Sequence, residues 1–417
     1  MKAIATMIRS HTKTVADILG RGPVHPFPSR MAAGIALEAL GKSKNRLRVL
    51  DPMAGSGTVL AVARANGHHA IGVDLDPLAV LLAGVWTRTV DAQAVSDKAA
   101  EVLDRAYSAF APLTTGQAYP EGSDVPTRKF IRYWFDDYAR RQLTALSAAI
   151  GRVHDDRVRD VLWCGFSRLI ITKSSGASLA MDLSHSRPHK EFDRAPVKPF
   201  SKFLSAVETV VCPRRNGTPV GPVSVVKRGD ARRLDIATGS IDLVLTSPPY
   251  LNAIDYMRCS KFSLVWMGYN VDRLREIRGD SVGAEASSEA AMDTPWVQVL
   301  IKQLGLAKKL SDHDRGLLAR YAHDMGGALA EVSRVLKAGG RAVYVVGDST
   351  VRGTFIRNSA IVAAVAQENG LTLESRHSRT LPANRRYMPP PKRGATSSSI
   401  EVRMRREVVL SFTKPAG

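Results

Sequence analysis

One strand–turn–helix–strand unit near the N-terminus constrains the fold more than any other feature of the chain. Residues 48–51 form a short apolar stretch expected to be a strand, and a turn with two glycines separates it from a helix expected at 59–66. A second apolar strand is expected at 70–74, and Asp76-Pro77 then begins another helix, with Asp as its N-cap and Pro at its first position. Strands that alternate with helices at this spacing predict a parallel α/β sheet.

The same pattern returns in the second half of the chain. Strands are expected at 223–228, 241–245, 341–346 and 407–412, and helices at 321–336 and 358–369. Between the two stretches helical periodicity dominates, with helices expected at 92–110, 136–150 and 157–171. We therefore expect an α/β fold with a mainly parallel, doubly wound, Rossmann-like sheet that is interrupted by a mainly helical insert. The expected division places the first half of the α/β domain at 1–90, the insert at 91–222 and the second half at 223–417.

The composition indicates a folded chain with an anionic partner. Of the 417 residues, 44% are hydrophobic and 24% are charged, which excludes disorder as the main state. Lys and Arg outnumber Asp and Glu by 59 to 39, and the net charge of +20 favours nucleic acid or an anionic membrane surface, with a basic host proteome as the alternative explanation. No apolar run approaches the roughly 18 residues of a membrane span and no secretory signal is recognised, so we expect a cytoplasmic protein without a membrane partner.

The cysteines and histidines predict no metal site. Cys164, Cys212 and Cys259 lie far apart without a CxxC pair, so neither a disulfide framework nor a cysteine-built zinc site is expected. His185 and His189 share one polar loop, and two histidines alone do not predict a bound metal.

The turn after the first strand has the chemistry of a cofactor loop. It reads Asp-Pro-Met-Ala-Gly-Ser-Gly-Thr from Asp51 to Thr58, and Asp74 ends the next strand. Glycines let a ligand approach the backbone closely, and a carboxylate at the end of the second strand can bind both hydroxyls of a ribose. The spacing departs from G-x-G-x-x-G, which disfavours a dinucleotide, and no Walker-type phosphate loop is present. An ordinary α/β turn with a capping Asp is the alternative.

A second loop of this kind follows the strand expected at 241–245. It reads Ser247-Pro248-Pro249-Tyr250, and two successive prolines stiffen the backbone and remove two donors. The Ser247 side chain and the Pro248 carbonyl are two fixed acceptors for an exocyclic amine, and Tyr250 offers a face on which a base can stack. Because a conjugated amine is a poor nucleophile, such acceptors would help it attack a methyl group. The alternative is a plain proline-rich turn.

The two loops together resemble those of the S-adenosylmethionine-dependent amino-methyltransferases of DNA, which modify N4 of cytosine or N6 of adenine. The resemblance covers about residues 23–90 and 223–346. It implies a class I methyltransferase fold, S-adenosyl-L-methionine as cofactor and double-stranded DNA as substrate. It marks as catalytic the residues Ser247, Pro248, Pro249 and Tyr250.

The resemblance also marks a set of cofactor-binding residues. Those in the turn are Asp51, Met53, Ala54, Gly55, Ser56, Gly57 and Thr58. Asp74 matches the ribose carboxylate, and Asp230 and Ala231 match the position beside the adenine ring. His25, Pro26 and Phe27 match the segment that closes over the methionine part of the cofactor.

The order of the parts resembles the subgroup whose target-recognition region interrupts the two halves. Here the insert enters one strand earlier than in that subgroup, because it precedes Gly229-Asp230-Ala231. We expect the insert to read the target sequence. Predicted DNA contacts are Arg187 and Lys190 in a polar loop of the insert, Asn252 after the catalytic loop, and Arg385 and Arg386 in a basic stretch. The alternatives are solvated basic loops and, for Asn252 and the nearby Asp255, Tyr256 and Arg258, packing of the next helix.

The predicted function is methylation of an exocyclic amine of a flipped base in DNA. Cytosine N4 is preferred over adenine N6 because Ser at the first position of the catalytic motif is found mostly with cytosine N4 in the resembled family. Methylation at cytosine C5 is excluded, since no cysteine follows a proline. The alternatives are a guanine amine in transfer RNA, disfavoured because only 22 residues precede Pro23, and a non-catalytic DNA-binding protein. A companion restriction enzyme is possible in this family, and the oligomeric state is left open.

Overall fold

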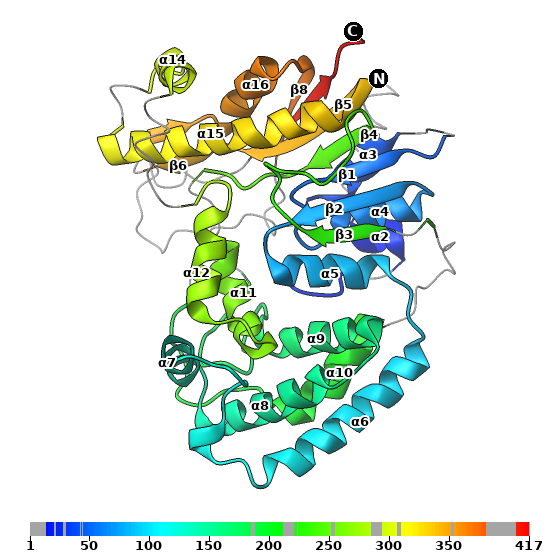
Figure 1. The fold of residues 1–417 in the computed structure, drawn as a ribbon, viewed down its shortest axis with the longest axis vertical. Helices are drawn as coiled ribbons and strands as arrows, with labels where there is room; N and C mark the ends of the chain where they lie inside the picture. The colour runs from blue at the N-terminus through cyan, green and yellow to red at the C-terminus, as the bar shows by residue number, and fades with distance from the viewer. Residues whose placement is uncertain are drawn as a thin grey trace.

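The fold has two layers, a twisted sheet with its helices and a helical lobe beneath it (Figure 1). The computed structural model describes residues 14–20, 22–27, 31–41, 43, 45–184, 188–211, 221–222, 224–251, 255–284, 294–306, 310–351, 354–380 and 406–416. Within these residues, no helix combines the length and the apolar character that crossing a bilayer requires.

The sheet has seven strands in the order β3-β2-β1-β4-β5-β9-β8. Their bounds are Arg48–Asp51 for β1, His69–Asp74 for β2, Val225–Arg228 for β3, Ile241–Thr246 for β4, Leu336–Gly347 for β5, Thr372–Thr380 for β8 and Arg406–Thr413 for β9. The first five strands in this order are parallel, and β9 pairs antiparallel with both β5 and β8. The predicted Rossmann-like, mainly parallel α/β fold is confirmed.

The strand order reverses between β1 and β4, and the register brings the two loops of interest together there. Val49 pairs with Leu243 and Leu50 with Val244, so both strands end at the same edge of the sheet. In open α/β sheets, ligands bind outside the carboxyl ends of the strands at such a switch point. The glycine turn and the Ser-Pro-Pro-Tyr loop both begin at this edge.

Helices cover both faces of the sheet because successive strand side chains point to opposite sides. On one face lie α3 (Ala33–Leu40) and α4 (Thr58–Ala65), which pack against Val49 and Leu243. On the other face lie α14 (Pro295–Gln303), α15 (Asp312–Val335) and α16 (Asn358–Glu368), which pack against a cluster containing Leu50, Val244 and Tyr344. The smaller elements of this layer are α2 (Val15–Leu19) and a hairpin of β6 (Ser349–Val351) and β7 (Thr354–Ile356).

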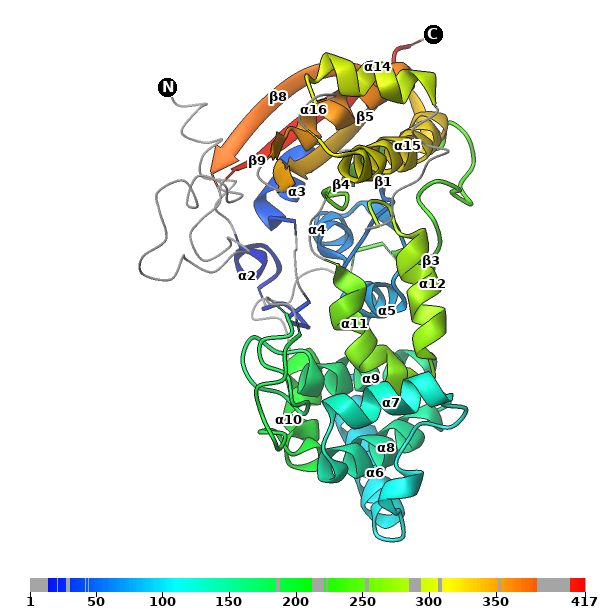
Figure 2. The same ribbon diagram turned by 90° about the vertical axis from the view of Figure 1, so that its left-hand side faces the viewer.

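The lobe combines helices from two parts of the sequence. From the insert come α6 (Ala92–Phe110), η1 (Thr115–Gln117), α7 (Val125–Trp134), α8 (Asp137–Gly151), α9 (Asp156–Ile170) and α10 (Pro199–Val211). After the catalytic loop, α11 (Tyr256–Leu264), η2 (Val265–Met267) and α12 (Val271–Asp280) join the same lobe. Figure 2 shows α11 and α12 side by side between the sheet and the lobe. The lobe therefore extends beyond the residues that the sequence assigned to the insert.

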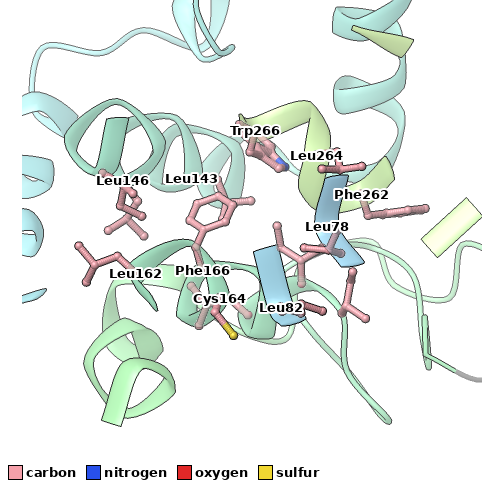
Figure 3. Packing of buried hydrophobic residues seen from close by; sticks show 14 of the residues in the cluster. Leu78, Leu82, Leu143, Leu146, Leu162, Cys164, Phe166, Phe262, Leu264 and Trp266 are labelled. Carbon is pink, nitrogen blue, oxygen red and sulfur yellow. The ribbon is translucent and has the colours of Figure 1, made fainter. Parts of the chain in front are cut away.

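One hydrophobic core joins the lobe to the sheet layer. Helix α5 (Pro77–Thr87) lies between them and contributes Leu78 and Leu82 to a cluster with Phe166 of α9 and Phe262 of α11 (Figure 3). Trp266 in η2 is 1% exposed and meets Phe135 edge-on at 5.1 Å between ring centroids. This packing fixes α11, which follows the Ser-Pro-Pro-Tyr loop, relative to the sheet layer.

The structure corrects the expected bounds of one helix and one strand, and it adds a strand that was not predicted. The helix expected at 321–336 begins at Asp312, where Ser311 caps it, and strand β5 begins at Leu336 rather than at 341. Gly339 and Gly340 lie within β5, where its register with β4 shifts. Strand β8 was not predicted, since its residues are mostly polar and exposed at the edge of the sheet.

Candidate active site

The two glycines of the first turn are required there for different structural reasons. Gly55 has φ 49° and Gly57 has φ 83°, both in the left-handed region that favours glycine. A Cβ on Gly57 would lie 2.7 Å from Ala83 Cα, so this glycine lets the start of α4 pack against α5. No atom lies within 4 Å of a Cβ placed on Gly55, which lines a pocket. The turn thus leaves open backbone facing a ligand site.

Asp74 is held at the end of β2 by two backbone donors. The Gly55 N–H donates to Asp74 Oδ2 at 2.7 Å, and the Asp76 N–H donates to Asp74 Oδ1 at 2.9 Å. Burial raises the pKa of Asp74, while these hydrogen bonds act in the opposite direction. Each carboxylate oxygen keeps a further acceptor site, so two neighbouring hydroxyls of a ribose can donate to it.

Asp51 links the cofactor turn to the catalytic loop. Its Oδ1 accepts from Thr246 Oγ1 at 2.7 Å and from the Met53 N–H at 3.2 Å. Burial raises the pKa of Asp51 to about 7, and the hydrogen bond from Thr246 lowers it. Because Thr246 directly precedes Ser247, this contact fixes the start of the catalytic loop against the end of β1.

Asp76 makes a similar link to α11. It caps α5 by accepting from the Leu78 N–H at 2.9 Å, and its Oδ2 accepts from Ser260 Oγ at 2.5 Å. Burial raises the pKa of Asp76 to about 7, against the hydrogen bond from Ser260. Sequence reasoning identified Asp76 only as a helix cap. Its partner Ser260 carries no local sequence signal.

One pocket collects most of the predicted site residues. Its walls include Phe27, Asp51, Met53, Ala54, Gly55, Ser56, Thr58, Asp74, Asp230, Ala231, Ser247, Pro249 and Tyr250. Residues that were not predicted as site residues also line it, among them Met31, Asp76, Asp255, Tyr256, Met257, Arg278 and the segment 281–284. The two motifs therefore face one cavity, as expected for a cofactor beside a substrate base.

The Ser-Pro-Pro-Tyr loop places its serine hydroxyl in a defined orientation. Ser247 Oγ donates to the Val345 carbonyl oxygen at 3.1 Å and lies 3.2 Å from the Tyr250 hydroxyl. Since the single hydroxyl proton of Ser247 goes to Val345, the Tyr250 hydroxyl is the donor in the second contact. The loop is held by β5, the strand that pairs with β4.

The lining of the pocket contains two stacked aromatic rings. Phe27 and Tyr256 are nearly parallel, with an interplanar angle of 8° and ring centroids 6.0 Å apart. Phe27 comes from the segment before α3, and Tyr256 begins α11. The sequence left two interpretations of Tyr256, as a residue of the pocket or as a packing residue of the next helix. The structure places it in the pocket wall.

Four of the residues predicted to bind the cofactor or to be catalytic lie outside the lining of the pocket. His25 is 1% exposed, and its Nε2 lies 3.0 Å from Ser167 Oγ, which in turn lies 2.8 Å from Ser263 Oγ. His25 therefore anchors its segment to α9 and α11, and its position gives no support to a cofactor contact. The other three are Pro26, Gly57 and Pro248.

The carboxylate of Asp230 is engaged by an arginine. Arg232 donates to both of its oxygens, with NH2 to Oδ2 at 2.7 Å and Nε to Oδ1 at 3.0 Å, and donates from NH1 to Asp324 at 2.5 Å. Asp230 lines the pocket, but its contact with the adenine amine stays a prediction.

Of the predicted DNA contacts, Lys190 alone falls within the described residues. It is exposed, and its Nζ lies 6.0 Å from the ring centroid of Tyr133 on α7. Arg187, Asn252, Arg385 and Arg386 lie outside the described residues.

Comparisons with known proteins find methyltransferases among the proteins similar to this chain. The chain is 21% identical over 369 residues to the Type II methyltransferase M.MvaI of Kocuria varians, covering 81% of this chain and 79% of that protein. It is 22% identical over 379 residues to the Type II methyltransferase M.AvaI of Nostoc, covering 80% and 75%. The chain is a relative of the S-adenosylmethionine-dependent DNA methyltransferases. The resemblance predicted from its two motifs is confirmed, although no protein-family model matches the chain.

A solved structure with a related description is a putative DNA modification methylase from Thermus thermophilus. It is 19% identical, with a TM-score of 0.24, over 45% of this chain and 52% of the other.

The predicted cofactor, S-adenosylmethionine, is confirmed, and the pocket of this methyltransferase relative suits it. The Thr58 hydroxyl is buried in the pocket lining at the first turn of α4, and it has no hydrogen-bond partner among the described residues. A polar ligand group at the positive end of that helix would satisfy it. Gly55 leaves room beside it, and Asp74 supplies acceptors for a ribose.

Proposed function

We propose that this protein transfers a methyl group from S-adenosylmethionine to the exocyclic amine of a flipped base in double-stranded DNA, and that the amine is N4 of cytosine. The observation that carries the proposal is the single pocket that contains both the glycine turn with Asp74 and the loop from Ser247 to Tyr250.

Ser247 is prepared to accept a hydrogen bond from the substrate. Its proton is given to the Val345 carbonyl, and one lone pair receives the Tyr250 hydroxyl. The remaining lone pair can accept an N–H of the target amine, as can the Pro248 carbonyl. Holding these protons localises the nitrogen lone pair, and the same bonds strengthen as the amine becomes positive during attack.

Tyr250 provides the stacking surface for the base. It is half-buried at the pocket wall beside Pro249. A base removed from the duplex loses its stacking partners, and an aromatic ring replaces part of that energy. Stiff prolines keep the ring and the Ser247 acceptor at a fixed spacing.

The cofactor, when bound, supplies a methyl group on a sulfonium. Asp74 would bind its ribose, Gly55 would allow the chain to approach it, and Thr58 would contact a polar group at the start of α4. Phe27 would lie over it, because it faces the same cavity. We assign reading of the target sequence to the helical lobe, which adjoins the catalytic loop through α11.

The choice of cytosine depends on the residue at the first motif position. A serine hydroxyl is a shorter acceptor than the Asp or Asn that is common in adenine enzymes of the resembled family. Here its proton is committed to Val345, so it acts as an acceptor only. The proposal includes a companion restriction enzyme as a partner of this methyltransferase.

Mass spectrometry of nucleosides from the DNA of cells expressing the protein tests the proposal. We expect N4-methylcytosine, absent from cells expressing the Ser247→Ala variant. N6-methyladenine alone would overturn the choice of base and leave the mechanism intact. A methylated guanine amine in transfer RNA would reassign the substrate, and no methylated amine in DNA or RNA would overturn the proposal.

A further inference from the structure

One arginine beside the pocket joins three parts of the chain. Arg232 follows β3, and it donates to both carboxylate oxygens of Asp230, from Nη2 to Oδ2 at 2.7 Å and from Nε to Oδ1 at 3.0 Å. Its Nη1 donates to Asp324 Oδ1 of α15 at 2.5 Å, and its Nη2 also donates to the Asp280 carbonyl oxygen at the end of α12, at 2.7 Å. The planar guanidinium has five donors in a fixed geometry, which suits it to several partners at once. Among the described residues, Asp230 lines the pocket and Arg232 does not.

The contact with α15 is built into that helix. Asp324 is 4% exposed, and a buried carboxylate requires a paired cation. One turn further along α15, a Cβ on Gly327 would lie 3.3 Å from Arg232 Cγ, so this glycine gives room for the stem of the arginine. The hydrogen bonds to Asp230 raise the pKa of Arg232 above its usual value, while burial acts in the opposite direction. The arginine is therefore held in one place as a charged group.

The end of α12 is held from the same helix. Arg320 of α15 donates to the Gly279 carbonyl oxygen, and its Nε lies 3.6 Å from Asp324 Oδ2. The last carbonyls of a helix have no partner within the helix, and cations suit its negative end. Arg320 and Arg232 thus bind two successive carbonyls where α12 ends close to α15 (Figure 1).

The residues that follow α12 form part of the pocket. The segment 281–284 lines it, directly after the two carbonyls that the arginines hold. A Cβ on Gly283 would lie 4.0 Å from the Tyr250 carbonyl oxygen, which places this segment beside the Ser-Pro-Pro-Tyr loop. The position of the end of α12 therefore sets the position of this wall.

We propose that Arg232 is a positioning residue that orients Asp230 toward the cofactor and, through the end of α12, keeps residues 281–284 beside the catalytic loop. This inference rests on the proposed function, which takes one pocket to hold the cofactor and the target base together. Asp230 Oδ1 also accepts from the Arg232 backbone N–H at 2.9 Å, so Oδ2 is the oxygen with more acceptor capacity left for a ligand amine. Asp324 is the shared anchor of both arginines.

Replacing Arg232 should affect both steps of the reaction. In Arg232→Gln, affinity for S-adenosylmethionine should fall roughly three- to tenfold, the value of one hydrogen bond, because Asp230 loses its fixed orientation. Turnover at saturating cofactor should also fall roughly tenfold or more, because a displaced wall misplaces the base. Arg232→Lys keeps a cation near Asp230 but lacks the planar set of donors, so it should restore cofactor affinity more than turnover.

The order of action is tested by a double variant. Asp230→Asn/Arg232→Gln should bind S-adenosylmethionine as weakly as Asp230→Asn alone, because Arg232 acts on the cofactor through Asp230. Effects on affinity that simply add would overturn this part of the inference.

Arg320→Gln separates the two effects. Arg320 binds the end of α12 and Asp324, and no contact with Asp230 is found among the described residues. Turnover should therefore fall several-fold, while cofactor affinity stays within about twofold of the parent. A loss of cofactor affinity equal to that of Arg232→Gln would contradict the separate roles.

Arg379→Gln is the matched control for loss of a paired arginine. Arg379 donates from Nε and Nη2 to Glu407 Oε2 on β9, at the edge of the sheet away from β3, and its side chain is 13% exposed. Its replacement should lower the free energy of unfolding, measured with urea, as Arg232→Gln does. Cofactor affinity and turnover should both stay within about twofold of the parent.

Calorimetry with S-adenosylmethionine gives the affinity, and transfer of labelled methyl groups to the nucleic acid that the parent methylates gives turnover. Losses in Arg232→Gln that the control does not share support the inference, whereas equal values for the two variants overturn it. Should Arg232→Gln not fold, Arg232→Lys and Arg320→Gln decide the same question. Failure of the proposed function is recognised in the parent alone, which would then bind the cofactor without methylating any amine."

Discussion

The two sides of the pocket carry different ionisable groups and are built in different ways. On the cofactor side, Asp51, Asp74 and Asp76 are buried carboxyl groups at strand ends, each held by hydrogen bonds at 3.2 Å or less. On the other side, Asp255 lies just before α11 and contacts Arg258 of α11 and Arg278 of α12. In the proposed function, the first side binds the cofactor and the second side faces the DNA.

The difference also concerns how each side is kept in place. The register of the sheet fixes the positions of the carboxyl groups, because β1, β2 and β4 are neighbouring parallel strands. The side of α11 and α12 depends on packing of the lobe, in which Phe262 and Trp266 anchor α11 and the following turn. Hydrogen bonds between the sides, such as Ser260 to Asp76, connect them. Variants on each side should therefore change different measured quantities.

The largest effect is expected for Ser247→Ala. Removing an acceptor that is most important in the transition state should lower turnover roughly 10²–10³-fold. Cofactor affinity, measured by calorimetry, should stay the same because the carboxyl side is intact. Turnover within a factor of two of the parent would contradict the assigned role. Ser240→Ala, at an exposed turn before β4, is the control.

Asp74→Asn should show the reverse pattern. The amide keeps one oxygen for the backbone donors and loses the charge that strengthens a ribose contact. Cofactor affinity should fall roughly ten- to a hundredfold, as expected for a hydrogen bond to a charged group. Calorimetry measures this, with the exposed Asp235→Asn as the control. An unchanged affinity would remove Asp74 from the cofactor site.

The common location of the glycine turn and Asp74 could be predicted from the sequence because its signals are local. The turn, its glycines and Asp74 lie within one βαβ unit, and parallel strands necessarily bring their carboxyl ends to one edge. The side of α11 and α12 could not be predicted in the same way. Tyr256 and Arg278 reach the pocket only because α11 and α12 fold back onto the lobe, a result of contacts between residues such as Phe135 and Trp266.

The strand that was not predicted and the buried contact of His25 have similar causes. Strand β8 has few apolar residues, and its pairing with β9 includes the ion pair of Arg379 with Glu407, which no local pattern reveals. His25 matched a family segment, but its partner Ser167 lies 142 residues away. Both depend on distant partners, whereas the helix expected at 92–110 was confirmed because its periodicity is local.

A smaller effect is expected for Asp76→Asn, on the pH dependence of the free energy of unfolding. The folded pKa of Asp76 is raised to about 7, so folding takes up a proton between about pH 4 and pH 7. Stability from this group therefore falls as the pH rises through that window. Asn has no such proton, so from pH 5 to pH 8 the parent should lose stability relative to the variant, on the order of 2 kcal/mol. Urea unfolding at both values measures this, with the exposed Glu208→Gln as control. A pH-independent difference would contradict the protonated state.

The smallest effect is expected for Tyr250→Phe, which keeps the ring and removes the hydroxyl that donates to Ser247 at 3.2 Å. Without that donor, Ser247 keeps its bond to Val345 and remains an acceptor, though a less firmly oriented one. Turnover should fall about two- to tenfold, the value of one neutral hydrogen bond, with DNA affinity unchanged. Tyr250→Ala is the matched comparison, because it also removes the stacking face, and it should weaken DNA binding by about 1–3 kcal/mol. If Phe and Ala variants lose the same DNA affinity, the ring does not stack on the base, and Tyr250 acts on Ser247 alone.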